Sequence, residues 1–264
     1  YAILRFANAR GAGAPKPLFL CEDAGVIGQP FFVMEKLPGV AAGHKVVRMA
    51  LDRKALAKEL AQAAARIHAI PAAAARTELP FLQRFTTREV IVACRAHLDA
   101  LTEPHPVLEY GLRWCELHAP TREETTFVHR DFRTGNYLVH EGRLTGILDW
   151  ELSTIGNPIA DFAYHLMAYR IPSGGVRGLA AVDLVAQGLP PESEYVAAYC
   201  AHRGIDHVPD LEYYLVFCMF RLAAICHGIR GRVERGTAVS PEAKKYAAQV
   251  EPLAQLALGT ALRS

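Results

Sequence analysis

Apolar positions near the start of the chain repeat first with helical and then with strand spacing. Three apolar side chains fall on one side of a helix over residues 1–9, and the glycines that follow would end it. Two short apolar runs, 18–21 and 31–34, are separated by a turn-forming stretch, and this pattern predicts an antiparallel hairpin. The Leu-Pro-Gly sequence at 37–39 then marks a domain boundary.

Helical spacing follows that boundary. Apolar residues three and four positions apart predict a helix from a cap at Asp52 to Pro71. The same spacing predicts helices over 90–101 and 108–115. This part of the chain is therefore expected to be mainly helical.

Strand spacing returns in the middle of the chain and is then lost again. Residues 126–128 read as a short strand, and 137–139 with 144–148 read as a second hairpin. Pro158 suits the first position of a helix, and helices are expected from there to the C-terminus. The later ones lie near 192–203, 210–230 and 241–262, with a kink at Pro252.

Composition describes a globular chain whose charges nearly cancel. Of its 264 residues, 51% are hydrophobic and 21% are charged. A chain of this length can form one large domain or two of moderate size. The net charge is only +2, so no basic field is available to attract a polyanion. We therefore expect no nucleic-acid partner.

Cysteines and apolar stretches indicate a reducing, aqueous setting. Six cysteines are scattered without a C-x-x-C pair, mostly inside apolar runs, and this usage predicts a cytoplasmic location. The longest apolar stretch, 213–229, contains Arg221 and His227, so we expect a core helix and no membrane partner. No secretory signal pattern opens the chain.

The most informative segment runs from His129 to Asn136 and has the pattern H-x-D-x-x-x-x-N. Asp149 follows as an acid that leaves an apolar strand just past the second hairpin. If Asp131, Asn136 and Asp149 converge, they offer the oxygen ligands that Mg²⁺ prefers in proteins. Such a site binds the phosphates of a nucleotide.

With these motifs the chain resembles the kinase-like fold and, within it, the aminoglycoside phosphotransferase family. Residues 33–39 resemble the last strand and hinge of the small lobe, 129–136 the catalytic loop, 148–151 the metal motif, and 156–163 the helix that follows. The sequences at 21–28 and 149–154 are most similar to the kinase subgroup associated with acyl-CoA dehydrogenases. His-Arg-Asp in place of the commoner His-Gly-Asp is a minor departure from the small-molecule pattern.

The resemblance implies an α+β, protein-kinase-like fold with two lobes. Residues 1–36 would be the remainder of a small antiparallel-sheet lobe that binds the nucleotide, and 37–39 would be the hinge. Residues 40–264 would form a large, mainly helical lobe that carries the catalytic loop and the substrate site.

Roles at the centre follow from the chemistry of phosphoryl transfer, in which the protein mainly aligns groups and stabilises charge. Asp131 would accept a hydrogen bond from the substrate hydroxyl and take its proton. Asn136 and Asp149 would hold Mg²⁺ against the phosphates of ATP. Arg133 would reach the transferring group and offset its developing charge.

Other positions would bind the nucleotide or support the loop. The resemblance implies that the backbone of Glu35 and Leu37 meets the adenine edge, with Met34 packing behind it. His129 and Asp161 would brace the catalytic loop without reacting.

Several of these residues also have simpler explanations. Asp and Asn are common in turns, so Asp131 and Asn136 could be only turn residues. Arg133 could be a solvated surface charge, and residues 37–39 could be only a turn. Asp161 lies in the first turn of a predicted helix, where the helix dipole stabilises a carboxylate in any case.

The segment that should precede the hinge strands in this family is not found. A glycine-rich loop, a strand with a phosphate-binding lysine and a helix with its glutamate partner are absent from the 264 residues. Either they lie before Tyr1 in a longer chain, as the non-Met start favours, or the chain is a degenerate kinase.

The acceptor is suggested only by charge. Glu151 follows the metal motif, and the long apolar helix carries Arg221, His227 and Arg230 as candidate substrate residues. Cations in that position favour an anionic hydroxy acid or hydroxyacyl-CoA over a polycationic aminoglycoside. They are equally explained by the stabilisation of basic residues at a helix C-terminus.

The sequence therefore favours an ATP- and Mg²⁺-dependent phosphotransferase that acts on a hydroxyl of a small molecule. The alternative is a non-catalytic pseudokinase that binds nucleotide or serves as a scaffold. A protein kinase is disfavoured because Asp-Trp replaces Asp-Phe-Gly and no Ala-Pro-Glu segment follows. The oligomeric state is not determined by these patterns.

Overall fold

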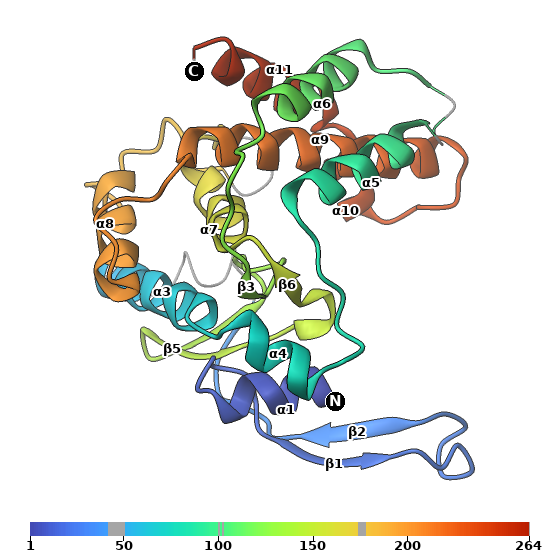
Figure 1. Cartoon of the computed structure of the whole chain (residues 1–264), viewed down its shortest axis with the longest axis vertical. Helices are drawn as coiled ribbons and strands as arrows, with labels where there is room; N and C mark the ends of the chain where they lie inside the picture. Colours follow the sequence, from blue (N-terminus) through green and yellow to red (C-terminus); the bar gives the residue numbers. More distant parts are fainter. Residues whose placement is uncertain (42–50, 100, 102, 174–177, 264) are drawn as a thin grey trace. The chain divides into compact units, whose positions relative to one another are not determined.

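The computed structural model describes residues 1–41, 51–99, 101, 103–173 and 178–263 (Figure 1). Two compact units share the chain, and each is built from three segments. Unit 1 consists of Tyr1–Arg84, Thr125–Pro158 and Leu184–His207. Unit 2 consists of Phe85–Glu124, Ile159–Asp183 and Val208–Ser264.

Unit 1 begins with the predicted helix and hairpin. Helix α1 spans Ala2–Ala9 and buries Leu4 and Phe6 on one side, as the apolar spacing predicted. Strands β1 (Pro17–Cys21) and β2 (Phe31–Met34) pair antiparallel and form the hairpin at the lower edge of Figure 1.

Two further pairs of strands lie in the middle segment of unit 1. Strands β4 (Tyr137–His140) and β5 (Arg143–Ile147) form the second predicted hairpin. Strand β3 (Thr126–Val128) pairs antiparallel with β6 (Thr154–Gly156). Strand β6 was not predicted, because its sequence Thr-Ile-Gly contains a single apolar side chain besides glycine and shows no apolar run.

Three further helices lie in the described residues of unit 1. Helix α3 (Arg53–His68) begins at the predicted cap, where the Asp52 side chain accepts a hydrogen bond from the Ala55 N–H at 3.0 Å. Helix α4 (Ala72–Glu78) was not predicted, because Pro71 was interpreted only as a stop although it also precedes a new helix. Helix α8 (Glu192–Arg203) packs along α3 (Figure 1).

An aromatic core in unit 1 lies directly under the H-x-D-x-x-x-x-N segment. The Phe6 ring of α1 meets Phe127 of β3 edge-on at 5.2 Å between centroids. Phe127 stacks on Trp150 at 6.1 Å, and Trp150 lies 4.7 Å from the ring of His129. Because these rings are buried, they connect the packing of α1 and β3 to the start of that segment.

The segment after β2 is fixed to the β4–β5 hairpin. The Val40 N–H donates to the Val139 carbonyl at 2.9 Å, and the Val139 N–H donates back at 3.1 Å. The Thr145 hydroxyl donates to the Pro38 carbonyl at 2.6 Å. Gly39 has a φ of 128°, and a Cβ there would lie 2.9 Å from the Val139 carbonyl oxygen. Glycine is therefore required at this crossing.

Unit 2 is helical and is organised around α9 (Leu211–Glu234), whose residues are mostly buried. The helices that pack on α9 include α5, α6, α10 and α11 (Figure 1). The bounds of the remaining elements are α5 Thr87–Asp99, α6 Pro106–His118, α7 Pro158–Leu166, α10 Pro241–Ala247 and α11 Val250–Ala261, with short 3₁₀ turns at Trp150–Leu152 and Met167–Tyr169.

Helix α9 is also long and apolar enough to be compared with a membrane span. It has 24 residues, and 78% of its most apolar window is buried inside the structure. This burial agrees with the sequence prediction of a core helix.

The prediction of one kinked helix over 241–262 was wrong. Helix α10 ends at Ala247, and α11 begins at Val250. Pro252 therefore lies in the first turn of a separate helix, where its missing N–H would have had no partner within the helix. Pro252 therefore marks the start of α11 and does not kink a longer helix.

We predict that Gly39→Ala lowers the free energy of unfolding by about 2–4 kcal/mol, because strained φ and contact with the Val139 carbonyl act together. The matched control is Gly11→Ala, whose φ is 66° and whose Cβ would meet no atom within 4 Å. That control should cost only about 1 kcal/mol. Urea denaturation measures both, and equal costs for the two variants would contradict the prediction.

The buried cysteines should be inert in the folded protein. Burial raises the pKa of the Cys218 thiol to about 12 and also raises the pKa of Cys115. At pH 8, we expect iodoacetamide to modify the partly exposed Cys21 and Cys94 before these two, since the thiolate is the reactive form. Mass spectrometry with and without denaturant tests this order, and early labelling of Cys218 would contradict it.

Candidate functional site

The loop between β3 and β4 is held in an unusual backbone conformation. Arg130 has a φ of 67° and Gly135 a φ of 121°. The Asn136 N–H donates to the Arg133 carbonyl at 2.9 Å and closes the loop before β4. The side chains of Asp131, Arg133 and Asn136 meet inside this loop.

His129 joins this loop to the end of β5. Its Nδ1 accepts from the Asp131 N–H at 3.2 Å, and its Nε2 lies 2.9 Å from the Leu148 carbonyl. Because a carbonyl only accepts, the ring proton must be on Nε2. The ring is fully buried. His129 therefore connects the start of the loop to the end of β5.

The Asp131 carboxylate receives donors on both oxygens. Arg133 Nε lies 2.9 Å from Oδ1 and 2.8 Å from Oδ2, and Asn136 Nδ2 lies 2.6 Å from Oδ2. The carboxylate side chain is only 13% exposed. It is therefore a fixed, partly buried anion with one side toward solvent.

The amide of Asn136 has a defined orientation. Its Nδ2 donates to the Asp131 carbonyl at 2.9 Å as well as to the carboxylate, so nitrogen and oxygen cannot be exchanged. The Leu148 N–H donates to the Asn136 carbonyl at 2.6 Å, one step beyond the pairing of Tyr137 with Ile147. Asp149 is the next residue and therefore starts beside Asn136.

Asp149, a predicted metal ligand, follows β5 with its carboxylate toward solvent. Its φ of 66° turns the chain sharply after β5, and its side chain is exposed. Among the described residues, no hydrogen bond or ion pair involves its carboxylate. An acid without a partner in a conformation that costs energy is common at functional sites.

The available donors fit a hard divalent cation. Asn136 can offer only its Oδ1, since Nδ2 is engaged, and Asp149 offers a carboxylate. The described part of the chain holds no cluster of three or more His, Cys, Asp and Glu with metal-binding geometry. One amide and one carboxylate suit Mg²⁺, which keeps several waters and takes phosphate oxygens as further ligands.

The predicted adenine-binding segment lies at the end of β2. The Glu35 N–H donates to the Lys16 carbonyl at 2.9 Å, so only its carbonyl is left for a ligand. A Cβ on Gly146 would approach Leu37 Cδ1 to 2.2 Å, which shows that Leu37 packs over β5. Met34 is 42% exposed.

The remaining predicted residues belong to different parts of the chain. Glu151 is exposed and lies in the 3₁₀ turn after Asp149, in unit 1. Asp161 is buried in the first turn of α7, in unit 2. Arg221 of α9 lies 5.7 Å from the centroid of the Tyr164 ring, also in unit 2.

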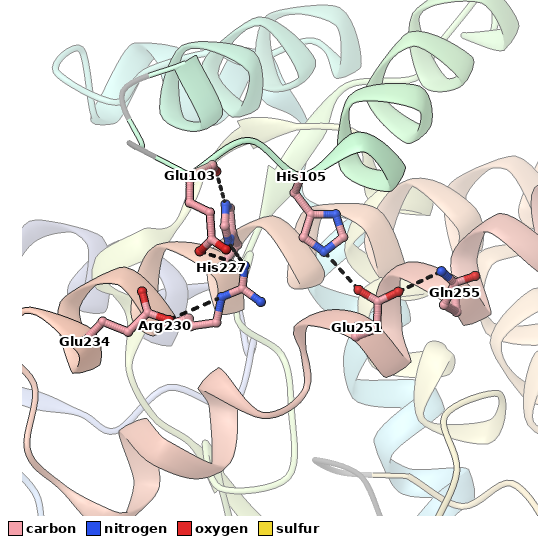
Figure 2. Close-up of polar contacts among 7 residues, drawn as sticks. All are labelled: Glu103, His105, His227, Arg230, Glu234, Glu251 and Gln255. Atoms are coloured by element: carbon pink, nitrogen blue, oxygen red, sulfur yellow. Dashed lines mark hydrogen bonds and ion pairs between the residues drawn. The ribbon is translucent and has the colours of Figure 1, made fainter.

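His227 and Arg230 bind Glu103, which lies between α5 and α6 (Figure 2). His227 Nε2 donates to the Glu103 carbonyl at 2.8 Å, and its Nδ1 accepts from Arg230 Nη2 at 3.0 Å. Arg230 Nη2 also lies 3.2 Å from the Glu103 carboxylate. Both ring nitrogens of His227 are thus engaged within unit 2, and its side chain is buried.

His105 is a part of this cluster that the sequence did not single out. It precedes α6, lies 3.3 Å from the Glu251 carboxylate through Nε2, and has its ring 5.5 Å from that of His227 (Figure 2). Only its position before Pro106 is visible in the sequence, and that signals a helix start without naming a partner.

Gly135 is a second residue that the sequence analysis missed. A Cβ there would lie 3.0 Å from Arg133 Nη1, and its φ is 121°. A glycine inside the H-x-D-x-x-x-x-N pattern was the available signal.

Comparison with protein families matches residues 1–207 to the phosphotransferase enzyme family. The chain belongs to this family. The predicted resemblance is thereby confirmed.

A curated relative supports the predicted subgroup of this phosphotransferase family. Acyl-CoA dehydrogenase family member 10 of Mus musculus is 35% identical over 262 residues, which cover 95% of this chain and 24% of the relative. The chain spans about a quarter to a third of the length of the curated relatives that it matches first.

Solved structures confirm the α+β, kinase-like fold of this family member. A protein of Ralstonia eutropha JMP134 that is assigned as an aminoglycoside phosphotransferase has a TM-score of 0.87 and 29% identity, covering 100% of this chain and 82% of that one. An aminoglycoside phosphotransferase in complex with GDP and kanamycin has a TM-score of 0.61 at 15% identity, covering 98% and 83%. At that identity the second likeness concerns the fold alone.

We predict that His227→Phe lowers the free energy of unfolding by about 1–3 kcal/mol, because the Glu103 carbonyl and Arg230 each lose a hydrogen-bond partner. The control is His207→Phe, at an exposed position. Thermal and urea denaturation report the difference. An unchanged stability would contradict this structural role and leave His227 available to a ligand.

Proposed function

We propose that this chain transfers the γ-phosphoryl group of ATP to a hydroxyl of a small molecule with the help of Mg²⁺. Asp131 is the catalytic base, and Asn136 and Asp149 hold the metal. Residues 1–36 and the hinge at 37–39 contribute to nucleotide binding, and the larger helical part from 40 to 264 carries the loop and the acceptor site.

One observation carries the proposal. The carboxylate of Asp131 and the amide of Asn136 lie 2.6 Å apart, and strand pairing starts Asp149 directly beside Asn136. Phosphoryl transfer needs a proton acceptor next to the groups that hold the metal and the phosphates. Separate turn residues have no reason to converge in this way.

The proposed step balances without a covalent enzyme intermediate. The acceptor oxygen forms a bond to the γ-phosphorus while the bond from that phosphorus to the β,γ-bridging oxygen breaks, and ADP leaves with the electron pair. The hydroxyl proton passes to the Asp131 carboxylate. Mg²⁺, when bound, offsets the negative charge of the phosphates.

Adenine binding is proposed at the end of β2. The Glu35 carbonyl and the Leu37 N–H are the groups suited to the adenine edge, and Met34 offers an apolar contact behind them. Gly39 and Thr145 hold this segment to the β4–β5 hairpin, and Asn136 and Asp149 flank the two ends of that hairpin. The proposal of adenine binding is therefore supported by the attachment of the segment after β2 to the hairpin next to the proposed metal residues.

The acceptor is proposed to be an anionic hydroxy acid or hydroxyacyl-CoA. Two of the three cations on which this rested, His227 and Arg230, are engaged by Glu103, and Arg221 is the one whose guanidinium has no carboxylate within 4 Å among the described residues. The relative with 35% identity is named for acyl-CoA dehydrogenases, which supports an acyl-CoA type of acceptor over an aminoglycoside. Glu151, in the turn after Asp149, remains a proposed substrate residue, and Asp161 at the start of α7 is proposed only to support the catalytic loop. The free cysteines support a cytoplasmic location.

The test is a phosphoryl-transfer assay on the longest natural chain that contains these residues, with Mg-ATP and a panel of hydroxy acids, hydroxyacyl-CoA thioesters and kanamycin. We expect transfer to an anionic acceptor, and a loss of about 10²–10⁴-fold in kcat for Asp131→Asn, since the base is removed. The control is Asp206→Asn, at an exposed position in unit 1.

Each outcome of that assay has a distinct meaning. Efficient transfer to kanamycin without turnover of hydroxy acids would overturn the anionic acceptor but keep the kinase. Binding of ADP without transfer to any acceptor would overturn the enzyme and favour the pseudokinase.

A further inference from the structure

Arg133 points its guanidinium toward Asp131. Its Nε lies 2.9 and 2.8 Å from the two carboxylate oxygens, close enough for one N–H to be shared by both. The arginine side chain is 28% exposed and the aspartate 13% exposed. An ion pair this sheltered is screened less by solvent than an ordinary surface pair, so it can fix the orientation of both groups.

The loop leaves space for this orientation of Arg133. Gly135 has no side chain where a Cβ would lie 3.0 Å from Arg133 Nη1, and its φ of 121° is one that other residues rarely adopt. The backbone turn Asn136 N–H to Arg133 carbonyl keeps the two residues on the same short loop. The guanidinium is therefore accommodated by the local backbone.

Donors are distributed unequally over the Asp131 carboxylate. Oδ2 receives Asn136 Nδ2 at 2.6 Å and Arg133 Nε at 2.8 Å, whereas Oδ1 receives, from the part of the chain that the structure describes, only Arg133 Nε at 2.9 Å. Each carboxylate oxygen can accept about two hydrogen bonds. Oδ1 is thus the oxygen with capacity left for a further donor.

We propose that Arg133 is a positioning residue, which orients Asp131 so that Oδ1 accepts the proton of the acceptor hydroxyl. This rests on the proposed function and replaces the sequence expectation that Arg133 stabilises the transferring phosphoryl group. A guanidinium whose charge is matched by Asp131 is less available to a phosphate. An aspartate carboxylate has only two side-chain torsions, and hydrogen bonds from Arg133 and Asn136 hold it in the alignment that phosphoryl transfer requires.

A double-mutant cycle distinguishes a role of Arg133 in orienting Asp131 from a role in stabilising the transferring phosphoryl group. Arg133→Met, Asp131→Asn and the double variant are assayed with Mg-ATP and the acceptor that the wild type uses. We expect Arg133→Met to lower kcat by about 10–100-fold with little change in the KM for ATP, since misplacement of a catalytic group by about 1 Å costs up to 10²-fold. In the Asp131→Asn background, the same substitution should change kcat by less than about twofold, because its effect passes through Asp131.

Two further measurements keep a folding defect from imitating this result. Arg143→Met, at an arginine on β5 whose side chain is 74% exposed, is the matched control. Mg-ADP affinity by calorimetry should be the same for wild type and Arg133→Met. The Nε–H signal of Arg133 in NMR spectra should exchange slowly in the wild type and rapidly in Asp131→Asn, which reports the contact without any turnover.

Opposite results identify which claim fails. Additive losses of kcat in the double variant, or a lower affinity of Arg133→Met for Mg-ADP, would overturn the positioning role. Either result would favour a direct contact of Arg133 with the phosphates. A signal of Arg133 that is insensitive to Asp131→Asn would overturn it as well. A wild type that transfers to no acceptor would overturn the proposed function and this inference together.

Discussion

The hydrogen bond from the Leu148 N–H to the Asn136 carbonyl, 2.6 Å long, is the constraint on which the candidate site depends. It continues the β4–β5 pairing by one step and brings two segments that are twelve residues apart in the chain to the same point. A slip of one residue in this register would turn the side chains of one strand to its other face. Asp149 would then no longer follow a residue that is hydrogen-bonded to Asn136.

The core of unit 1 stabilises that arrangement from below. Trp150 follows Asp149 directly and donates through Nε1 to the Ile147 carbonyl at 2.7 Å, while its ring packs against Phe127 and His129. His129 in turn hydrogen-bonds on both sides of the site. Packing therefore explains why Trp150 follows Asp149 and why His129 lies close to Asp131 in the chain. Packing does not explain the exposed carboxylate of Asp149.

Charge in unit 2 is arranged differently from charge in the loop. Glu103, His227 and Arg230 bind one another across elements that pack within that unit, and His105 contacts both the His227 ring and Glu251 (Figure 2). Buried polar groups generally need such partners, because an unpaired one loses its hydration without compensation. Basic residues on an apolar helix thus belong to the packing of unit 2 unless an independent observation connects them to a ligand.

The sequence by itself determined the hairpins, the cap at Asp52, the core character of α9 and the family, because these follow from local spacing and from motifs of fixed length. Only the tertiary structure decided the pairing of β6 with β3, the break before Pro252, the attachment of Arg133 to Asp131 and the binding of His227 to Glu103. The sequence Thr-Ile-Gly of β6 shows no apolar run, and the partner of a charged side chain depends on residues that lie close in space. Each of these features is defined by a distance between atoms or by a backbone angle. A pattern of residue types contains neither.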